Sequence, residues 1–157
     1  PTRTGNHYIN MAPYGVYNGK NGQSIILAAY NGTMWPRLCK AIGRPDMIDS
    51  ESFSTNVARL KNIKELVAIV EEWLRGFDDI GDAVKILKDA NVACCKIKTT
   101  DEVVNDPALI ERGTIIDVET APSFKEHSTI KTRGPWMKLS KTPAVQKRSC
   151  DLGELIL

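Results

Sequence analysis

The residues with the chemistry for proton transfer are few, and they lie far apart in the sequence. His7 and Tyr8 stand in the opening segment, where an imidazole and a phenol could donate or accept a proton. No obvious carboxylate partner accompanies them, so an ordinary position on a surface loop is the better interpretation of His7. His127 lies in the polar turn from Lys125 to Ser128, and we interpret it as surface too. These side chains alone do not make an acid/base site.

The sequence motifs of common active sites are absent. The chain has no Gly-x-x-x-x-Gly-Lys-Ser/Thr loop, no Gly-x-Ser-x-Gly elbow and no His-Glu-x-x-His helix. Asp78, Asp79 and Asp82 form an acidic cluster just before a predicted helix, where carboxylates favour the positive end of the helix dipole. This structural explanation needs no catalysis. The residues by themselves therefore predict no catalytic group in this chain.

The four cysteines do not predict a metal site. Cys39, Cys94, Cys95 and Cys150 show no Cys-x-x-Cys spacing, and only two histidines could join them as ligands. A structural zinc site needs four ligands in recognisable clusters, so we expect no metal. Cys39 falls on the apolar face of a predicted helix, and Cys94-Cys95 fall in a predicted buried strand. Reduced thiols that serve as small apolar side chains explain them.

Length and composition indicate one globular domain. The 157 residues are 42% hydrophobic and 25% charged, and the formal net charge is +2. This charge is too small to predict binding to nucleic acid or to an anionic membrane. No apolar run approaches the roughly 20 residues that span a membrane, and the polar opening residues do not resemble a signal peptide. We therefore expect a cytoplasmic protein.

The first part of the chain predicts a hairpin followed by helices. A strand over residues 14–17 and an apolar strand over 23–30 are joined by Asn18-Gly19-Lys20-Asn21-Gly22, whose residues tolerate positive φ. The continuous apolar run favours a buried central strand. A helix should begin after Asn31-Gly32-Thr33 and end at Gly43, whereas residues 44–57 look irregular and polar, with room for one short helical turn. The clearest helix runs from Asn62, which with Glu65 has the spacing of a capping box, to Gly76.

The second part predicts shorter elements. We expect a helix over residues 80–88, strands over 92–97 and 114–119, and two short helices opened by Thr99 with Glu102 and by Asp106-Pro107. From Ala121 onward the pattern loosens into short extended pieces, which should lie on another surface. The exposed-looking Trp136 could dock there. The predicted fold class is α/β (α+β): a small, largely antiparallel sheet with helices packed on it, and extended N- and C-terminal arms.

An ordered set of segments resembles one known family. It comprises residues 3–7 and 12–17, the turn 18–22, the strand 24–28, Met34-Trp35-Pro36-Arg37-Leu38-Cys39, Ile42-Gly43-Arg44-Pro45, residues 59–62, 91–94 and 105–107, and the return segment 131–143. Together these resemble the small domain of type III (CaiB/BaiF-like) CoA-transferases and cover most of the chain. The tail 148–154 is similar to the family's Pro-x-Leu-Gly-Glu-His segment, with Cys150 in place of proline and Leu155 in place of histidine.

The resemblance implies an activity that this chain does not carry alone. Family members move CoA between carboxylic acids through mixed anhydrides on an aspartate of the large domain, upstream of the matched region. Coenzyme A or acyl-CoA is then a substrate of the full-length enzyme, and no cofactor is expected on this chain alone. The implied partners are acyl-CoA, a carboxylic acid and the large domain, within an interlocked homodimer. The isolated chain is predicted to be inactive.

The resemblance also implies a division of the chain and one set of site residues. Residues 1–13 correspond to a linker and a loop near the active site, 14–120 to the small domain, and 121–157 to an extended return segment that packs on the large domain. The loop carries Asn6, His7 and Tyr8, which are the predicted substrate-binding residues. In some relatives this loop is glycine-rich and shields the reactive intermediate, whereas here it is bulkier.

Three functional hypotheses remain open at this point. The first is a part of a CoA-transferase, and the second is a fragment of a 2-methylacyl-CoA racemase. The third is a stand-alone domain that binds acyl-CoA or a protein without catalysis. The acyl donor and acceptor are not determined by the sequence, because half of the pocket would come from other polypeptide.

Overall fold

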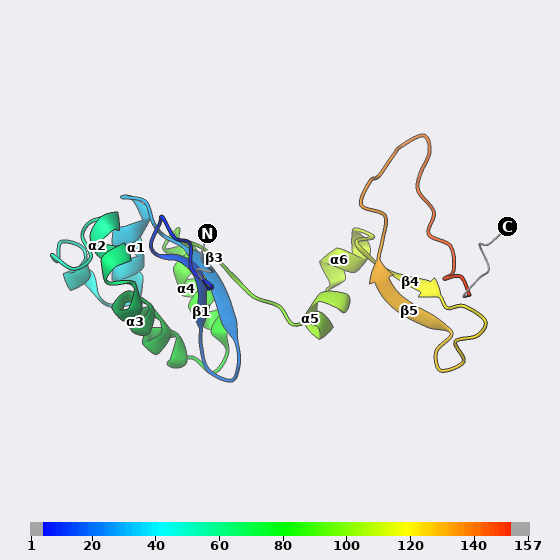
Figure 1. Cartoon of the computed structure of the whole chain (residues 1–157), viewed down its shortest axis with the longest axis horizontal. Coiled ribbons are helices and arrows are strands. Elements are labelled where there is room, and N and C mark those ends of the chain that lie inside the picture. The colour runs from blue at the N-terminus through cyan, green and yellow to red at the C-terminus, as the bar shows by residue number, and fades with distance from the viewer. Residues whose placement is uncertain (1–4, 152–157) are drawn as a thin grey trace. The chain divides into compact units, whose positions relative to one another are not determined.

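The computed structural model describes residues 5–151, which divide into two compact units (Figure 1). The first unit ends at Ile97 and the second begins at Lys98. This division falls inside the segment 14–120 that the family resemblance assigns to one small domain, and those boundaries stay a prediction. Residues 1–4 of the predicted linker and 152–157 of the predicted return segment lie outside the described residues.

The sheet of the first unit has three antiparallel strands in the order β1-β2-β3. β1 (Tyr14–Asn18) and β2 (Ser24–Ala28) form the predicted hairpin, with Val16 opposite Ile26. Asn21 and Gly22 turn the chain with φ of 56° and 73°, as the sequence of the turn predicts. β3 (Ala93–Lys96) pairs with the other side of β2, so that β2 is the central strand.

Helices cover one face of this sheet (Figure 1). They are α1 (Met34–Ala41), α2 (Asn56–Lys61), α3 (Ile63–Arg75) and α4 (Ile80–Asp89), with a 3-10 turn, η1 (Pro45–Met47), between α1 and α2. Their apolar stripes meet Tyr17, Ile25 and Leu27 from the sheet in one core, whose buried side chains all lie between Ala12 and Val92. Cys39 is buried in this core, as its place on the apolar helix face predicts.

The other face of the sheet stays partly exposed, which corrects the expectation of fully buried strands. Ile26 on the central strand is 39% exposed, and Cys95 opposite it on β3 is exposed. The apolar run 23–30 suggested burial on both faces, but the described residues place helices on one face only. Side chains therefore alternate along β2 between the core and the open face.

Residues 44–57 contain a short helical turn, η1, as expected, and α2 begins at their end, at Asn56, with Thr55 as a side-chain cap. The capping box predicted at Asn62 is wrong. Asn62 does not cap α3 with its side chain. Asn62 is also the C-cap of α2, and its Nδ2 donates to the Ser52 carbonyl oxygen at 3.0 Å. The Asn62 side chain, which a capping box would require, is instead hydrogen-bonded to the loop before α2.

The second unit has its own two-stranded sheet. β4 (Ile115–Glu119) pairs antiparallel with β5 (Thr129–Arg133), which lies in the tail that was expected to form extended pieces on another surface. The two short helices are α5 (Thr100–Val104) and α6 (Pro107–Glu111), with the predicted caps at Thr99 and Asp106. The predicted α/β class with antiparallel pairing is confirmed, although the described strands form two small sheets rather than one.

Candidate functional site

The loop before β1 is held against that strand by backbone pairing. The Tyr8 amide donates to the Tyr14 carbonyl oxygen at 2.8 Å, and the Val16 amide donates to the Asn6 carbonyl oxygen at 3.0 Å. His7 and Gly15 form an antiparallel bridge between these two bonds. Residues 6–8 therefore continue the sheet for one short step beyond β1.

Gly15 permits this close approach. A Cβ atom at position 15 would lie 2.5 Å from the Asn6 carbonyl oxygen and 2.7 Å from Nδ1 of His7. Such distances are far inside van der Waals contact, so any side chain here would push the loop away from the strand. The glycine thus allows Asn6 and His7, two of the three predicted site residues, to lie against β1.

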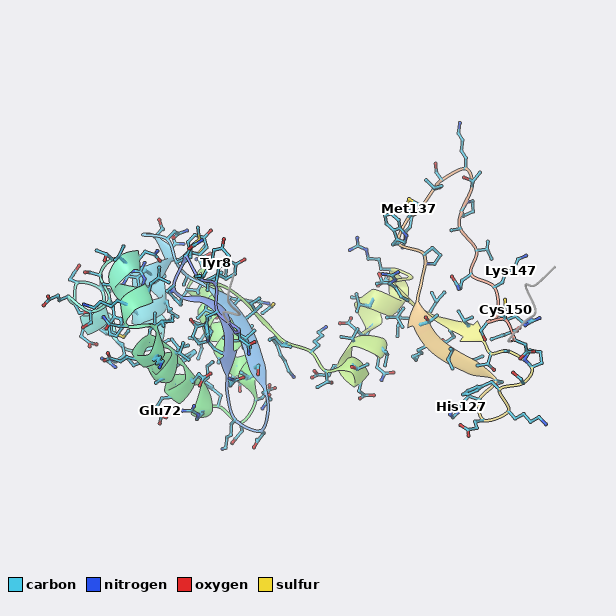
Figure 2. The ribbon with its side chains drawn as sticks, in the orientation of Figure 1. Tyr8, Glu72, His127, Met137, Lys147 and Cys150 are labelled. Atoms are coloured by element: carbon cyan, nitrogen blue, oxygen red, sulfur yellow. The ribbon has the colours of Figure 1, made fainter. Side chains whose placement is uncertain are left out.

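The structure brings Asn6, His7 and Tyr8 together in the first unit, whereas His127 lies in the second. Figure 2 labels Tyr8 and His127. Asn6 is exposed and Tyr8 is 47% exposed, so an amide and a phenol are available to a ligand. His7 is half-buried, and its ring meets that of Tyr17 edge-on at 5.0 Å. The loop presents hydrogen-bonding groups on one side and an imidazole packed into the core on the other.

Two buried polar atoms at this position have no hydrogen-bond partner: Nδ1 of His7 and the hydroxyl of Tyr17. Burial lowers the pKa of His7, and the charge of Glu71 opposes this effect in part. Burial also raises the pKa of Tyr17, and Glu71 acts in the same direction. At neutral pH the pair is therefore a neutral imidazole beside a neutral phenol.

The nearby carboxylate of Glu71 is already hydrogen-bonded to other groups. Its Oε1 accepts from the backbone amide of Asn18 at 3.0 Å and from Nδ2 of Asn18 at 2.9 Å. Its Oε2 accepts from Arg75 at 3.2 Å. Glu71 acts on His7 and Tyr17 through its charge, so the loop has no paired acid and base. The arrangement suits contact with a ligand rather than proton transfer.

Two residues of α2 that the sequence did not single out as site residues contact the same loop. Asn56 accepts a hydrogen bond from the Ala12 amide and donates one to the Asn10 carbonyl oxygen. Arg59, which is 3% exposed, donates to the Ala12 carbonyl oxygen. A buried arginine has no sequence pattern of its own.

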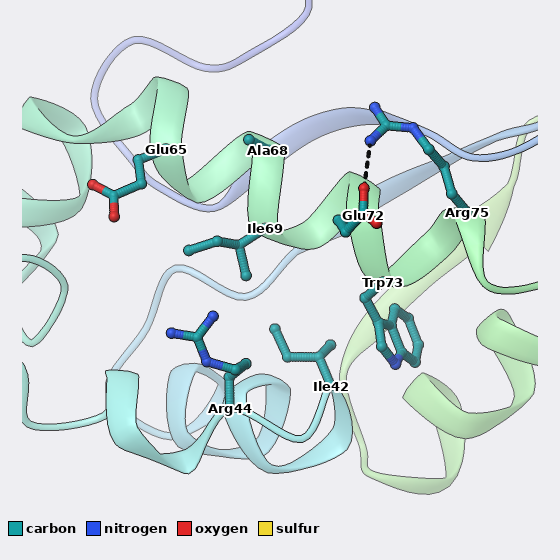
Figure 3. A pocket seen from close by; sticks show the side chains of 8 residues that line it. All are labelled: Ile42, Arg44, Glu65, Ala68, Ile69, Glu72, Trp73 and Arg75. Carbon is teal, nitrogen blue, oxygen red and sulfur yellow. Dashed lines mark hydrogen bonds and ion pairs between the residues drawn. The ribbon is translucent and has the colours of Figure 1, made fainter.

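A separate groove of about 550 Å³ lies between α3 and the residues that follow α1 (Figure 3). Apolar lining comes from Ile42, Ile69 and Trp73. Of the charged groups at its rim, Arg75 pairs with Glu72 at 3.1 Å and Arg44 pairs with its neighbour Asp46, whereas Glu65 also lines the groove. The groove therefore offers an apolar wall whose two arginines are each already paired with a carboxylate.

Two further observations concern metal ions and membranes. Within residues 5–151, no group of three or more His, Cys, Asp or Glu side chains is placed to hold a metal ion. In the same part of the chain, no helix has both the length and the apolar character to cross a membrane.

Comparison with known proteins identifies relatives over most of the chain. The family model described as CoA-transferase family III matches residues 1–154. A succinyl-CoA–D-citramalate CoA-transferase of Chloroflexus aurantiacus is 31% identical over 142 residues, which are 90% of this chain and 34% of that protein. A formyl-CoA:oxalate CoA-transferase of Rhodopseudomonas palustris is 31% identical over 121 residues, which are 77% of this chain and 27% of that protein.

A solved structure shares the fold. A CAIB/BAIF family protein from Brucella suis superimposes with a TM-score of 0.76 and 26% identity, over 91% of this chain and 35% of that protein. The chain thus spans about a third of the length of the relatives that it matches.

Proposed function

The chain belongs to CoA-transferase family III, and from this membership we propose that it forms the part of a CoA-transferase that shapes and covers the acyl site. The whole enzyme would move CoA from an acyl-CoA to a carboxylic acid. The aspartate that forms the mixed anhydride would lie on a large domain outside this sequence. Coenzyme A and its thioesters are then substrates, and this chain needs no cofactor of its own.

The structural observation that supports this proposal is the composition of the loop 6–8. It presents the amide of Asn6 and the phenol of Tyr8 to solvent and has no paired acid and base. Anhydride chemistry needs a carboxylate that attacks the thioester carbonyl, with release of the CoA thiolate. The carboxylate of Glu71 is held by Asn18 and Arg75 and does not meet this need. The loop therefore suits substrate contact, with the nucleophile supplied from elsewhere.

The relatives favour transfer over racemisation. The two curated relatives described above are named for CoA transfer to citramalate or oxalate, which are small carboxylic acids. The proposal for the whole protein includes a cytoplasmic location, an interlocked homodimer and a large domain that the tail 121–157 contacts. Family membership and the third of the relatives' length that this chain spans support these features of the proposal.

The experiment compares two proteins: this 157-residue chain, and a protein that carries it within the full length of its relatives. Succinyl-CoA or formyl-CoA is incubated with a panel of carboxylic acids, and new acyl-CoA esters are measured by chromatography. We expect transfer by the longer protein and none by the 157-residue chain. Measurable CoA exchange by the shorter chain would refute the proposal. Exchange of the α-proton of a 2-methylacyl-CoA without CoA transfer would establish the racemase instead.

Substitution of Tyr8 tests its contact with substrate. In the longer protein, Tyr8→Phe should raise KM for the acid or the acyl-CoA about fivefold, because one neutral hydrogen bond contributes about 1 kcal/mol. Tyr14→Phe is the matched control, since Tyr14 lies beside Tyr8 with ring centroids 5.4 Å apart but belongs to the strand rather than the loop. Steady-state kinetics of both variants distinguish the two positions. Equal effects would argue against a specific contact by Tyr8.

A further inference from the structure

Arg59 is a buried cation whose acceptors are backbone carbonyls rather than carboxylates. Its Nε donates to the Ala12 carbonyl oxygen at 2.6 Å. Its two terminal nitrogens donate to the carbonyl oxygens of Tyr30 at 3.1 Å, Phe53 at 2.9 Å and Ser54 at 3.3 Å. The ring of Trp35 lies 4.6 Å from the guanidinium carbon and adds a cation–π contact. One side chain thus joins the loop before β1, the segment after β2 and the turn before α2.

Asn56 contacts the same loop from one turn earlier on α2. Its Oδ1 accepts from the Ala12 amide at 3.0 Å, and its Nδ2 donates to the Asn10 carbonyl oxygen at 2.9 Å. With Arg59 on the Ala12 carbonyl oxygen, both backbone polar groups of Ala12 are satisfied by side chains of α2. Buried backbone groups require partners, so these side chains do for residues 10–12 what a neighbouring strand does in a sheet.

The loop is therefore held at two points along its length. β1 pairs with its first half through Asn6 and Tyr8, and α2 holds its second half through Asn10 and Ala12. A shift of residues 6–8 away from β1 would have to move residues 10–12 as well, against the bonds from α2. This attachment therefore determines where the exposed groups of Asn6 and Tyr8 lie.

We propose that Asn56 and Arg59 are positioning residues, which hold the loop 6–12 in the conformation that presents Asn6 and Tyr8 to substrate. The attachment itself is a property of this chain. Its consequence for turnover rests on the proposed function.

Asn56 is the sharper probe of the two. Removal of Arg59 would leave several buried carbonyl groups without a donor and could prevent folding. Asn56 is only partly buried, and Asn56→Ala removes both of its bonds to the loop while α2 keeps its Thr55 cap. Asn56→Asp keeps the acceptor for the Ala12 amide and places an oxygen against the Asn10 carbonyl oxygen. Val57→Ala is the matched control, because Val57 is the next residue of the same helix and is 76% exposed.

Hydrogen exchange of the 157-residue chain, followed residue by residue by NMR, tests the attachment. In Asn56→Ala, the amides of Tyr8 and Ala12 should exchange about tenfold faster, whereas the amides of Val70 and Leu74 in α3 keep their rates. Asn56→Asp should show a similar local effect, and Val57→Ala should show none. Unchanged exchange at Tyr8 in Asn56→Ala would overturn the proposal. An equal increase at Tyr8 and Val70 would do the same, because it would indicate general destabilisation.

Kinetics of the longer protein test the consequence. Asn56→Ala should lower kcat/KM about tenfold, and Val57→Ala should leave it unchanged. A variant with a loosened loop and unaltered kcat/KM would overturn the positioning role. If the unsubstituted protein transfers no CoA, the proposed function fails, and hydrogen exchange still decides whether α2 holds the loop.

Discussion

Gly15 shows how one residue can decide the geometry of the candidate site. Gly15→Ala should detach residues 6–8 from β1, because the added methyl would lie 2.5 Å from the Asn6 carbonyl oxygen. We expect a loss of about 1–3 kcal/mol in the free energy of unfolding, as for other overpacked positions. Chemical denaturation measures this loss, and exchange of the Tyr8 amide reports the local change. Gly32→Ala is the control, since a Cβ there would meet nothing within 4 Å; an equal loss in both variants would contradict the explanation.

The cysteines should differ in reactivity because they differ in burial. Burial raises the pKa of Cys39 to about 12, so at pH 8 this thiol stays protonated and also lies out of reach of solvent. Cys95 and Cys150 are exposed. Iodoacetamide at pH 8, followed by mass spectrometry of peptides, should modify Cys95 and Cys150 in the folded chain and Cys39 only after denaturation. Modification of Cys39 at the same rate as Cys95 would show that its helix does not pack as described.

The same thiol predicts a decline in stability at high pH. The folded state keeps the proton of Cys39 up to about pH 12, whereas an unfolded thiol loses it near pH 8.5. The folded state therefore binds more protons between these values, and this group makes the free energy of unfolding fall as the pH rises through that window. Cys39→Ala should make the free energy of unfolding fall less steeply with pH, as measured by urea denaturation from pH 8.5 to 10. An unchanged slope would count against the described environment of Cys39.

At the scale of the element, α5 offers the cleanest relation between sequence and local structure. Thr99 accepts from the Glu102 amide at 3.2 Å, and Glu102 accepts from the Thr99 amide at 2.8 Å, which completes the predicted capping box. Thr99→Ala should cost about 1 kcal/mol of local stability. The measure is faster hydrogen exchange of the Val103 amide, which bonds to the Thr99 carbonyl oxygen. Thr100→Ala is the neighbouring control and should have little effect.

Elements were predictable where the determining contacts are local. The hairpin β1–β2 follows from two strand-like runs around a turn rich in Asn and Gly, and the caps of α5 and α6 lie within three residues of the groups that they satisfy. The capping box at Asn62 failed because the Asn62 side chain bonds to Ser52, ten residues away. β5 was missed as a partner of β4 because its sequence, TIKTR, has little apolar pattern and its strand depends on pairing.

The candidate site was predictable in part. Asn6, His7 and Tyr8 are adjacent in the sequence and lie together in the loop, although their role as substrate contacts stays a prediction. The partners that hold the loop were not predictable by the same means. Asn56 and Arg59 are more than forty residues from Asn10 and Ala12, and nothing in their local pattern distinguishes a buried guanidinium from an exposed one. Only the packing of α2 brings them to the loop.

At the scale of the whole molecule, the first unit should fold without the second. Every buried side chain of its core lies between Ala12 and Val92, and its three strands and four α-helices all end before Lys98. A chain of residues 1–97 should therefore keep a cooperative thermal transition and protected amides in β2. Circular dichroism during heating and hydrogen exchange provide the measurements. A non-cooperative transition in the shorter chain, with the 157-residue chain as reference, would show that the core depends on later residues.

The carbonyl acceptors of Arg59 have a consequence for the behaviour of the protein in acid. Neither these carbonyl oxygens nor the amide of Asn56 takes up a proton in the ordinary acidic range, so acidification does not weaken the bonds from α2 to the loop. The ion pair of Lys20 with Asp78 on the surface differs, because its attraction ends once the carboxylate is protonated. As the pH falls, surface ion pairs of this kind should dissociate, and any loosening of the loop before β1 should begin at the half-buried His7 rather than at its bonds to α2.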